Sequence, residues 1–390
     1  MADVSSSSRK DLAAPRIAIA CSGLGNIRRG NESWAQVAAE SLNKAGSRVT
    51  LFGGGALRDV GCPYSQIANL PRDSFLTHGW LPWRYRYLFE QLTAAGSLML
   101  RRPWRDFDIM HIADPDLALQ MRRRTEKTGL RVIYKDGLLL GPPFCRNFDF
   151  VHVLAPYYRE EAESSGIDVK NWFVIPHMVN SEQFRVARNK EAIRKASGLA
   201  IEPGALVALA VGDFSPESNK RLDWIVSEFA AMGSKTPAYL CLAGQSSESD
   251  FTNFERKTKA LLGNRAHIFR NLGADEITRL YQAADLFAHA ALREPFGIVL
   301  IEAMATGLPV VGHHFPVTKW IIGDGGTTID MTQPGCLTSI LELWSTDSEL
   351  RNSLGEKARA RATSEFSPRR VIPLYESMYH KVASTPRLLQ

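Results

Sequence analysis

Short apolar runs rich in β-branched residues alternate with segments of helical periodicity along the first half of the chain. The run RIAIACS at residues 16–22 is typical of a buried strand, and residues 31–45 follow it with apolar side chains at helical spacing. Asn31 is expected to cap this helix and Gly46 to end it. We expect strands at 16–22, 47–52, 108–112, 131–135, 148–154 and 172–175, and helices near 31–45, 84–99, 115–127 and 156–165.

The second half repeats this alternation, and after about residue 333 only helical patterns remain. Strands that alternate with helices predict parallel sheets covered by helices, so the expected fold class is α/β with doubly wound, Rossmann-like domains. The expected strands here are 206–211, 238–243, 267–269, 286–289 and 309–312, and the expected helices are 221–232, 251–262, 275–284 and 297–306.

The length of 390 residues predicts two domains, because domains usually hold about 100–200 residues. A charged, weakly patterned stretch near residues 179–204 marks the boundary between them. We expect a disordered tail at 1–14, a Rossmann-like domain at 15–180, a linker at 181–203, a second Rossmann-like domain at 204–365, and a helix at 366–390 that crosses back to the first domain.

The composition argues against several classes of protein. No run approaches the roughly 20 apolar residues that a membrane span needs, and the first residues lack the apolar core of a signal peptide. Five well-separated cysteines, with no CxxC or Cys/His cluster, argue against a disulfide framework and against a structural zinc site. These features favour a protein of the reducing cytoplasm.

The positive charge of the chain is uneven. Of the net charge of +6, most belongs to the first 180 residues, which hold 23 Lys/Arg against 18 Asp/Glu. Residues 80–105 place three tryptophans near five arginines, a combination that suits an anionic lipid interface. One interpretation is a peripheral contact with the inner face of a membrane, and the other is a helix packed on its own domain. Nucleic acid is not an expected partner, because the basic residues form no recognised module.

Three glycines, Gly23, Gly25 and Gly30, lie between the first expected strand and the first expected helix. Glycine lets the backbone approach a ligand closely, and the start of a helix favours an anion. The spacing is not GxGxxG, so the loop gives weak support for a dinucleotide site. It either faces a phosphate or sugar, or it forms a purely structural turn.

The segment REPFGIVLIEAMATGLPVV carries the most informative chemistry. Gly297 is expected to open a helix after a strand and a loop, and Gly307 to end it. The free amides of residues 297–299 would form an anion site suited to a diphosphate. Glu294 precedes the helix, and Glu302 lies inside it among apolar neighbours. Both carboxylates are therefore candidates to accept hydrogen bonds from vicinal diols, rather than solvated residues.

Lys220 and Arg221 follow another strand and precede another helix, within VGDFSPESNKRL. A surface pair of cations is often without function, but at the carboxyl end of a strand it can neutralise phosphates. The position favours that second interpretation.

Together these motifs resemble the retaining glycosyltransferases of family 4, which have the GT-B fold of two Rossmann-like domains facing a central cleft. The resemblance covers most of residues 15–385 and is strongest at 205–366. It rests on two glutamates separated by seven residues, Glu294 and Glu302, and on VGDFSPESNKRLDWI, LAGQ, AADLFAHAAL, IPHMVNSEQF and EFSPRRVIPLYESMY in the family's order.

The resemblance implies a role for each candidate residue. Glu294 and Lys220 would be catalytic, with Glu294 on the hydroxyls of the donor sugar and Lys220 on the diphosphate leaving group. Glu302 would bind the ribose of the nucleotide. The remaining donor-binding candidates are Arg221, Phe296, Gly297, Ile298 and Val299, with Gly25 and Gly30 on the first domain's side of the cleft.

No metal or other cofactor is expected beyond the nucleotide sugar itself. Cations and helix dipoles can carry the charge of a leaving group without a metal. Asp114 and Asp116 have the spacing of a DxD metal pair, but they open an expected helix, where Asp114 would act as a cap.

Three positions depart from the family's pattern. Asp213 follows Gly212 where an arginine is usual, Ala113 stands where a site histidine is common, and His177-Met178 replaces Asn-Gly. The reaction expected by resemblance is transfer of a hexose from a nucleoside diphosphate sugar, UDP-linked in preference to GDP-linked, to a hydroxyl acceptor with retention of configuration. A sugar-nucleotide epimerase, a phosphorylase or a non-catalytic sugar-nucleotide-binding protein would be the alternatives.

Overall fold

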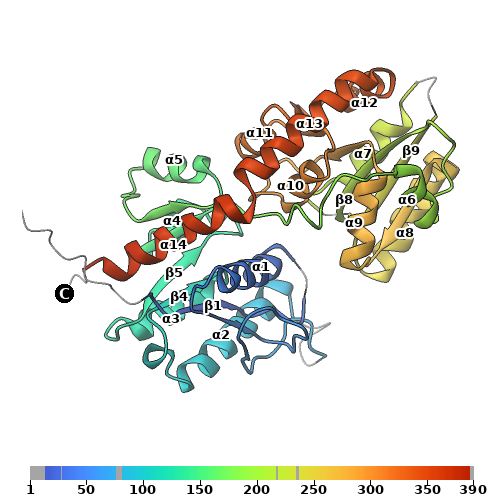
Figure 1. Cartoon of the computed structure of the whole chain (residues 1–390). Coiled ribbons are helices and arrows are strands. Elements are labelled where there is room, and N and C mark those ends of the chain that lie inside the picture. Colours follow the sequence, from blue (N-terminus) through green and yellow to red (C-terminus); the bar gives the residue numbers. More distant parts are fainter. Residues whose placement is uncertain (1–13, 28, 76–80, 217, 234–236, 387–390) are drawn as a thin grey trace, which may run out of the picture. The chain divides into compact units, whose positions relative to one another are not determined.

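The computed structural model describes residues 14–27, 29–75, 81–216, 218–233 and 237–386 (Figure 1). The expected disordered tail at 1–14 therefore lies outside the described residues, apart from residue 14. The chain divides into two compact units, and each is described by itself. Unit 1 comprises Met1–Val153, Ser165–Phe173 and Ile372–Gln390, and unit 2 comprises Leu154–Ser164 and Val174–Val371.

Unit 1 is built on a seven-stranded sheet with the order β3-β2-β1-β4-β5-β6-β7. Strand β1 pairs in parallel with both β2 and β4. The chain adds β2 and β3 on one side of β1 and then β4 to β7 on the other side, so the strand order reverses between β1 and β4. This order contains that of the Rossmann fold, in which ligands bind beyond the carboxyl ends of the strands at such a reversal. The strands are β1 (Ile17–Cys21), β2 (Val49–Gly53), β3 (Tyr64–Gln66), β4 (Ile109–Ile112), β5 (Arg131–Lys135), β6 (Phe150–Val153) and β7 (Trp172–Val174).

The first helix of unit 1 starts one residue earlier than expected. It begins at Gly30, with Arg29 at the cap position, so Asn31 falls inside the first turn. The Asn31 side chain accepts a hydrogen bond from Lys135 Nζ at 2.9 Å instead of capping the helix. Gly46 follows the helix end as expected, with φ +96°. The helices of this unit are α1 (Gly30–Lys44), α2 (Trp83–Leu100), η1 (Pro103–Arg105), α3 (Pro115–Thr125) and α4 (Pro142–Cys145).

The last helix, α14 (Pro368–Ser384), completes the core of unit 1 from Ile372 onward. Tyr375 and Tyr379 are fully buried in it. The Tyr375 hydroxyl accepts a hydrogen bond from Trp34 Nε1 at 2.8 Å, and the Tyr379 hydroxyl lies 2.9 Å from His111 Nδ1. Side chains of β4 and α1 are thus joined to a helix more than 260 residues later in the chain.

Unit 2 repeats the same topology with a six-stranded sheet in the order β10-β9-β8-β11-β12-β13. Strand β8 pairs in parallel with β9 and β11, so the reversal here lies between β8 and β11. The prediction of an α/β fold with doubly wound parallel sheets is confirmed. The strands are β8 (Leu206–Asp213), β9 (Ala238–Gln245), β10 (Ala266–Arg270), β11 (Leu286–His289), β12 (Val310–His313) and β13 (Gly326–Ile329).

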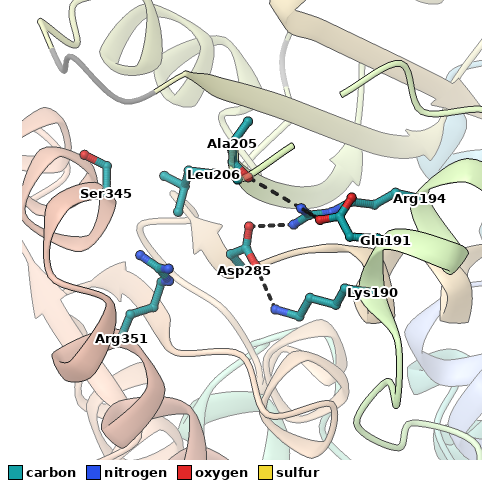
Figure 2. Close-up of a pocket in the computed structure, with 9 residues that line it drawn as sticks. Lys190, Glu191, Arg194, Ala205, Leu206, Asp285, Ser345 and Arg351 are labelled. Carbon is teal, nitrogen blue, oxygen red and sulfur yellow. Dashed lines mark hydrogen bonds and ion pairs between the residues drawn. The ribbon is translucent and has the colours of Figure 1, made fainter. Parts of the chain in front are cut away.

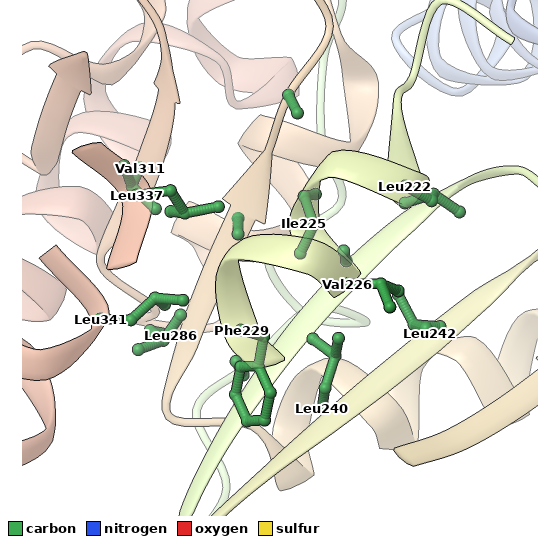
Figure 3. Close-up of a cluster of buried hydrophobic side chains, with 14 of the residues drawn as sticks. Leu222, Ile225, Val226, Phe229, Leu240, Leu242, Leu286, Val311, Leu337 and Leu341 are labelled. Carbon is green, nitrogen blue, oxygen red and sulfur yellow. The ribbon is translucent and has the colours of Figure 1, made fainter. Parts of the chain in front are cut away.

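The core of unit 2 forms where helices pack on this sheet (Figure 3). Helix α7 (Leu222–Ala230) directs Ile225 and Phe229 toward Leu240 of β9, and α12 (Cys336–Thr346) adds Leu341. Each of these buried side chains contributes about 1.5–3 kcal/mol by leaving water. The other helices are α5 (Pro156–Ser164), α6 (Lys190–Ala196), α8 (Glu248–Leu262), η2 (Gly263–Arg265), α9 (Ala274–Ala283), α10 (Ile298–Ala305), α11 (Pro316–Ile322) and α13 (Ser348–Glu365).

The structure contains several short helices and strands that the sequence did not predict. The expected linker, residues 181–203, contains helix α6, which packs on α9 within unit 2. The sequence also gave no indication of β3, α4, α11 and β13, which are three to seven residues long. Periodicity cannot develop over so few residues. Among the described helices, none combines the length and the apolar character needed to cross a membrane.

Candidate functional site

The reversal of strand order in unit 2 brings two loops of the chain together. Lys220 lies on the loop after β8, and Glu294 on the loop after β11. Lys220 Nζ lies 2.5 Å from Glu294 Oε2 and forms an ion pair with it. The two residues expected to be catalytic are therefore in direct contact at the carboxyl edge of the sheet, where open α/β sheets bind their ligands.

Two further groups of unit 2 contact Glu294, and a third contacts the preceding residue, Arg293. His289, the last residue of β11, places Nε2 3.3 Å from the same Oε2 atom. The Tyr158 hydroxyl donates to the backbone carbonyl of Glu294 at 3.0 Å, and Asn219 Nδ2 donates to the carbonyl of Arg293 at 3.4 Å. These contacts fix both the loop and the carboxylate, which is 7% exposed.

The electrostatics of this cluster favour an ionised Glu294 beside a neutral histidine. Burial alone would raise the pKa of Glu294, but the charge of Lys220 and the hydrogen bond of His289 outweigh it and lower this pKa to about 2. Burial lowers the pKa of His289, and the charge of Lys220 adds to that effect. A neutral His289 can donate to Glu294 only when Nε2 carries its proton.

Glycine residues at the strand ends make room for Lys220. A Cβ atom on Gly212 would lie 2.7 Å from Lys220 Cβ, and one on Gly244 would lie 1.7 Å from the Gly212 carbonyl oxygen. Only glycine at both positions lets β8 and β9 approach and lets the lysine stem cross the strand end. Asp213, which departs from the family's pattern, accepts a hydrogen bond from Ser215 N at 2.8 Å and so shapes the same loop.

The second glutamate, Glu302, lies in the second turn of α10 and has a different environment. Its Oε2 atom accepts a hydrogen bond from the Tyr281 hydroxyl at 2.9 Å. Burial raises the pKa of Glu302 to about 7, and the bond from Tyr281 opposes this only in part. Among the described residues, no ion pair joins Glu302 to a cation, so the pKa values of the two glutamates lie far apart.

The start of α10 separates the two glutamates. Gly297 is its cap residue with φ +86°, a left-handed conformation that a Cβ atom would strain, and Thr306 and Gly307 end the helix as expected. The amides of Ile298 and Val299 have no acceptor inside the helix, because they belong to its first turn. Because these amides lie at the positive end of the helix, they can donate hydrogen bonds to an anion.

The side chains of two donor-binding candidates, Phe296 and Arg221, are held by other residues, and Phe296 was expected to serve through its backbone amide. Phe296 is 1% exposed and packs against the rings of His177, Trp320 and Phe366, so only its backbone can serve a ligand. Arg221 donates to Asp223 through Nε and Nη2, at 3.0 and 2.7 Å. Its guanidinium also stacks 3.8 Å above the Trp224 ring, so Arg221 does not join the Lys220–Glu294 pair. His177, the other departure, forms part of this aromatic core.

The two candidate glycines of unit 1 have unequal surroundings. Gly25 has φ +87°, and a Cβ atom there would lie 2.6 Å from the backbone of Gly55. Gly25 therefore forms a tight turn, and the contact of this loop with a phosphate or sugar stays a prediction. Gly30 is exposed, and a Cβ atom there would meet nothing within 4 Å.

The sequence did not reveal the charged cluster beneath this glycine loop. At the β1–β4 reversal, Ser22 N donates to Asp114 Oδ2 at 2.5 Å, so Asp114 occupies the cap position of α3 without using its side chain as a cap. Arg72 Nη2 lies 2.6 Å from Glu90 Oε1 and 3.6 Å from Glu32 Oε1. All five of these residues are almost fully buried. Arg72 and Glu90 lie on a loop and a helix, and no spacing in the sequence connects them.

The remaining departure, Ala113, is buried and directly precedes Asp114. The nearby His111 is buried too, and its Nε2 atom lies 3.1 Å from His152 Nδ1. These side chains belong to the core of unit 1. Among the described residues, no group of three or more His, Cys, Asp or Glu side chains is arranged to hold a metal ion.

A polar pocket of about 210 Å³ lies at the opposite edge of the unit 2 sheet, where β8 and β11 begin (Figure 2). Asp285 lies between Lys190 Nζ and Arg194 Nη2, at 2.8 and 2.7 Å. Arg194 also donates to the carbonyl of Ala283 at 2.9 Å. These ion pairs fasten α6 to the sheet, which gives the expected linker a structural role.

Comparisons with known proteins bear on unit 2 most directly. Residues 190–361 match the family described as Glycosyl transferases group 1. The matched segment is similar to the domain of this family and lies within unit 2. It contains the Lys220–Glu294 pair, Glu302 and the whole of α10, so the candidate site lies in the part of the chain that matches the family.

Similar curated proteins match part of the chain. The chain is 30% identical over 167 residues to the N-acetyl-alpha-D-glucosaminyl L-malate synthase of Bacillus anthracis, covering 42% of each chain. It is 27% identical over 197 residues to the lipopolysaccharide glucosyltransferase WaaG of Escherichia coli, covering 49% of this chain and 50% of that protein. The chain thus spans at most half the length of these two relatives.

Solved structures share the fold over nearly the whole chain. Sucrose-phosphate synthase from Thermosynechococcus elongatus has a TM-score of 0.78 at 17% identity, covering 94% of this chain and 99% of that one. Anabaena Alr3699/HepE, solved in complex with UDP and glucose, has a TM-score of 0.73 at 17% identity, covering 95% of this chain and 100% of that one. The fold is therefore that of GT-B glycosyltransferases.

Proposed function

We propose that the chain transfers a hexose from a nucleoside diphosphate sugar to a hydroxyl acceptor, with retention of configuration. The observation that carries this proposal is the Lys220–Glu294–His289 cluster at the β8–β11 reversal, beside the first turn of α10. A cation, free helix amides and two carboxylates are what a sugar diphosphate needs, because its phosphates require positive charge and its diols require acceptors.

In this proposal Lys220 and the first turn of α10 stabilise the diphosphate as it leaves. Lys220 Nζ uses one N–H toward Glu294 and retains two for phosphate oxygens. Glu294, ionised and fixed by His289, accepts hydrogen bonds from hydroxyls of the donor sugar. Glu302 accepts from the ribose. Arg221 has at most a secondary role, since Asp223 and Trp224 already hold it.

The contacts of Glu294 support a same-face mechanism over a covalent intermediate. Its Oε2 atom already binds Lys220 and His289, which favours a role in holding the donor sugar over attack on the anomeric carbon. The bond from the anomeric carbon to the diphosphate oxygen would break while the bond to the acceptor oxygen forms on the same face. The departing diphosphate would take the proton of the acceptor hydroxyl, so the reaction balances without a metal ion or any other cofactor.

We favour a UDP-sugar as the donor, with a GDP-sugar as the alternative. The structural neighbour Alr3699/HepE was also solved with UDP-glucose, which supports a uridine donor for this fold. For the acceptor we propose a hydroxyl on a glycan, a glycolipid or a metabolite, lipid-linked or anionic, because the first 180 residues carry most of the positive charge. We place the reaction in the cytoplasm, in keeping with five cysteines that are all free thiols.

The first experiment is thermal unfolding with UDP, GDP and ADP, each alone and as common sugar conjugates. A ligand at 100 times its dissociation constant stabilises a protein by about 2.7 kcal/mol. We expect one base to raise the melting temperature, and Glu302→Ala to abolish that shift. Glu356→Ala, an exposed carboxylate on α13, is the matched control and should keep it. A shift that survives in Glu302→Ala would remove the ribose assignment.

The second experiment follows transfer itself. Incubation with the stabilising donor and a panel of hydroxyl acceptors should yield a glycoside whose anomeric configuration, read by NMR, matches that of the donor. Inversion would overturn the retaining mechanism. Isomerisation of the donor without acceptor would indicate an epimerase, sugar phosphate formation from inorganic phosphate would indicate a phosphorylase, and binding without turnover would indicate a non-catalytic protein.

A further inference from the structure

Helix α2 of unit 1 presents an apolar stripe to solvent. Tyr85, Phe89 and Leu92 are 40%, 43% and 36% exposed, and their spacing of four and three residues puts them on one face of the helix. Leu100, which is 87% exposed, continues the stripe at the helix end. The stripe therefore extends about 22 Å at 1.5 Å per residue.

The opposite face of the same helix already has its partners. Tyr87 donates to Asp114 at 2.7 Å, Glu90 binds Arg72, and Gln91 accepts from Asp116 N at 2.8 Å. The exposed stripe is thus separate from the buried side of α2, to which Ala94, Ala95 and Leu98 also belong. Isolated exposed apolar residues need no explanation, whereas a contiguous stripe of this kind marks an interaction surface.

Arginines outnumber carboxylates around the stripe, where the nearby exposed acidic residues are Asp73, paired with Arg86 at 3.7 Å, and Asp106, which follows Arg105. Five arginines lie between residues 83 and 105, and the only acidic residue in that range, Glu90, is buried. Arg84 precedes Tyr85, while Arg102 and Arg105 follow the helix and are exposed. Within the described ranges, neither Arg102 nor Arg105 has an acidic side chain as its partner.

We propose that this side of α2 docks on a bilayer containing anionic phospholipid. We call it the α2 face, defined by Tyr85, Phe89, Leu92, Leu100, Arg84, Arg102 and Arg105. Its rings and leucines would enter the boundary between headgroups and acyl chains, and its guanidinium groups would lie on lipid phosphates. A stripe on which arginines outnumber the exposed carboxylates complements a negatively charged surface.

Sedimentation with vesicles tests the proposal without donor or acceptor, so its outcome is independent of sugar transfer. The full chain should bind vesicles of phosphatidylcholine with about one third phosphatidylserine, and binding should weaken as salt is raised. Each basic residue near an anionic leaflet strengthens binding about fivefold, so R102Q/R105Q should bind about 25-fold more weakly. R256Q/K257Q, which removes two exposed cations from α8, is the matched control and should bind as the unmodified chain does.

The apolar part has its own test. F89S/L92S should lose vesicle binding while its melting temperature stays near that of the unmodified chain, because both side chains are already partly solvated. L261S/L343S replaces exposed leucines of unit 2 and should bind normally. Equal binding to neutral vesicles, or binding unchanged in both α2 variants, would overturn the proposal. A dimer in solution that F89S/L92S dissociates, with no vesicle binding, would assign the face to a second copy of the chain instead.

Discussion

The two units use the same topological position in opposite ways. In each sheet the connections reverse between two central strands, and in each a hydrogen bond of 2.5 Å joins the loops that follow those strands. In unit 2 that bond is an ion pair between Lys220 and Glu294, and Lys220 is 24% exposed. In unit 1 it joins the Ser22 amide to a completely buried Asp114.

The difference lies in how each carboxylate is compensated. Glu294 has a lysine and a histidine within hydrogen-bonding distance and is ionised. In unit 1 Glu32, Glu90 and Asp114 gather around one Arg72, and burial raises the pKa of both Glu32 and Asp114. At this edge of the sheet, the charged groups of unit 2 include a partly exposed lysine that a ligand can reach. Those of unit 1 are buried and bind other buried groups of that unit. Substitutions should therefore affect binding and rate in unit 2, and stability in unit 1.

The strongest test of this contrast is Arg72→Met. It removes the guanidinium that holds Glu90 and Glu32 in the interior, so the free energy of unfolding of unit 1 should fall by about 3–5 kcal/mol. Hydrogen exchange of the β1 and β4 amides in increasing urea would measure it. Arg102→Gln, at an exposed arginine, should change that free energy by less than about 0.5 kcal/mol. If the β1 and β4 amides exchanged at similar rates in the two variants, the charged cluster of unit 1 would not have the stabilising role assigned to it.

The corresponding change in unit 2 is Lys220→Met, which should act on rate. Removing one preorganised group that stabilises developing charge costs about 100–1,000-fold in kcat, and the same loss is expected for Glu294→Gln. Initial rates with the donor found by thermal unfolding would show it. Arg221→Ala is the control, because Asp223 and Trp224 already hold that side chain, and its loss should stay below about tenfold. An equal loss for Lys220 and Arg221 would contradict the assignment.

The glycines of the unit 1 loop offer a smaller and finer test. Gly25→Ala places a Cβ atom against Gly55 in a left-handed conformation and should destabilise unit 1 by about 1–3 kcal/mol. Gly30→Ala meets open space at the start of α1 and should be neutral or slightly stabilising, by up to about 1 kcal/mol. Urea unfolding measures both. If Gly30→Ala instead weakens donor binding at unchanged stability, that glycine contacts the ligand rather than only starting the helix.

The mildest effect concerns pH and Glu302. Its pKa of about 7 in the folded chain exceeds the ordinary value of 4.5, so its contribution to stability is complete below pH 4.5 and is lost as the pH rises through 7. If the ionised form accepts the ribose hydroxyls, nucleotide affinity should rise about tenfold per pH unit below pH 7 and level off above it. Titration calorimetry across this range would show the curve, and Glu302→Gln should flatten it. A flat curve in the unmodified chain would mean that Glu302 does not act as a carboxylate toward the ligand.

Sequence patterns predicted the long elements because their periodicity reports which face is buried. Strand β1 and helix α10 each begin and end one residue from their expected bounds. The patterns also gave Lys220 and Glu294 as candidates because each lies on a loop that follows a strand, and Glu302 because its neighbours in the sequence are apolar. They missed β3 and β13, which are too short to show a period, and α6, whose residues appeared only as a charged stretch.

The partners of the candidate residues were harder to predict, because they come from other elements. His289 ends β11 five residues before Glu294, and that proximity was the available signal. Tyr281 lies on α9, where an aromatic residue looks like any core residue until its hydroxyl is seen against Glu302. Arg72, Glu90 and Asp114 come from a loop, a helix and a strand end. Only the folded topology of unit 1 brings these three together.

The division of unit 1 along the chain has a consequence for how the protein is made. A ribosome delivers β1 to β6 first, but the rings of Tyr375 and Tyr379 that cover Trp34 and His111 arrive only with α14. Almost all of unit 2 lies between these two parts and emerges as one stretch. The nascent chain should therefore finish unit 2 before unit 1 closes, although unit 1 begins first.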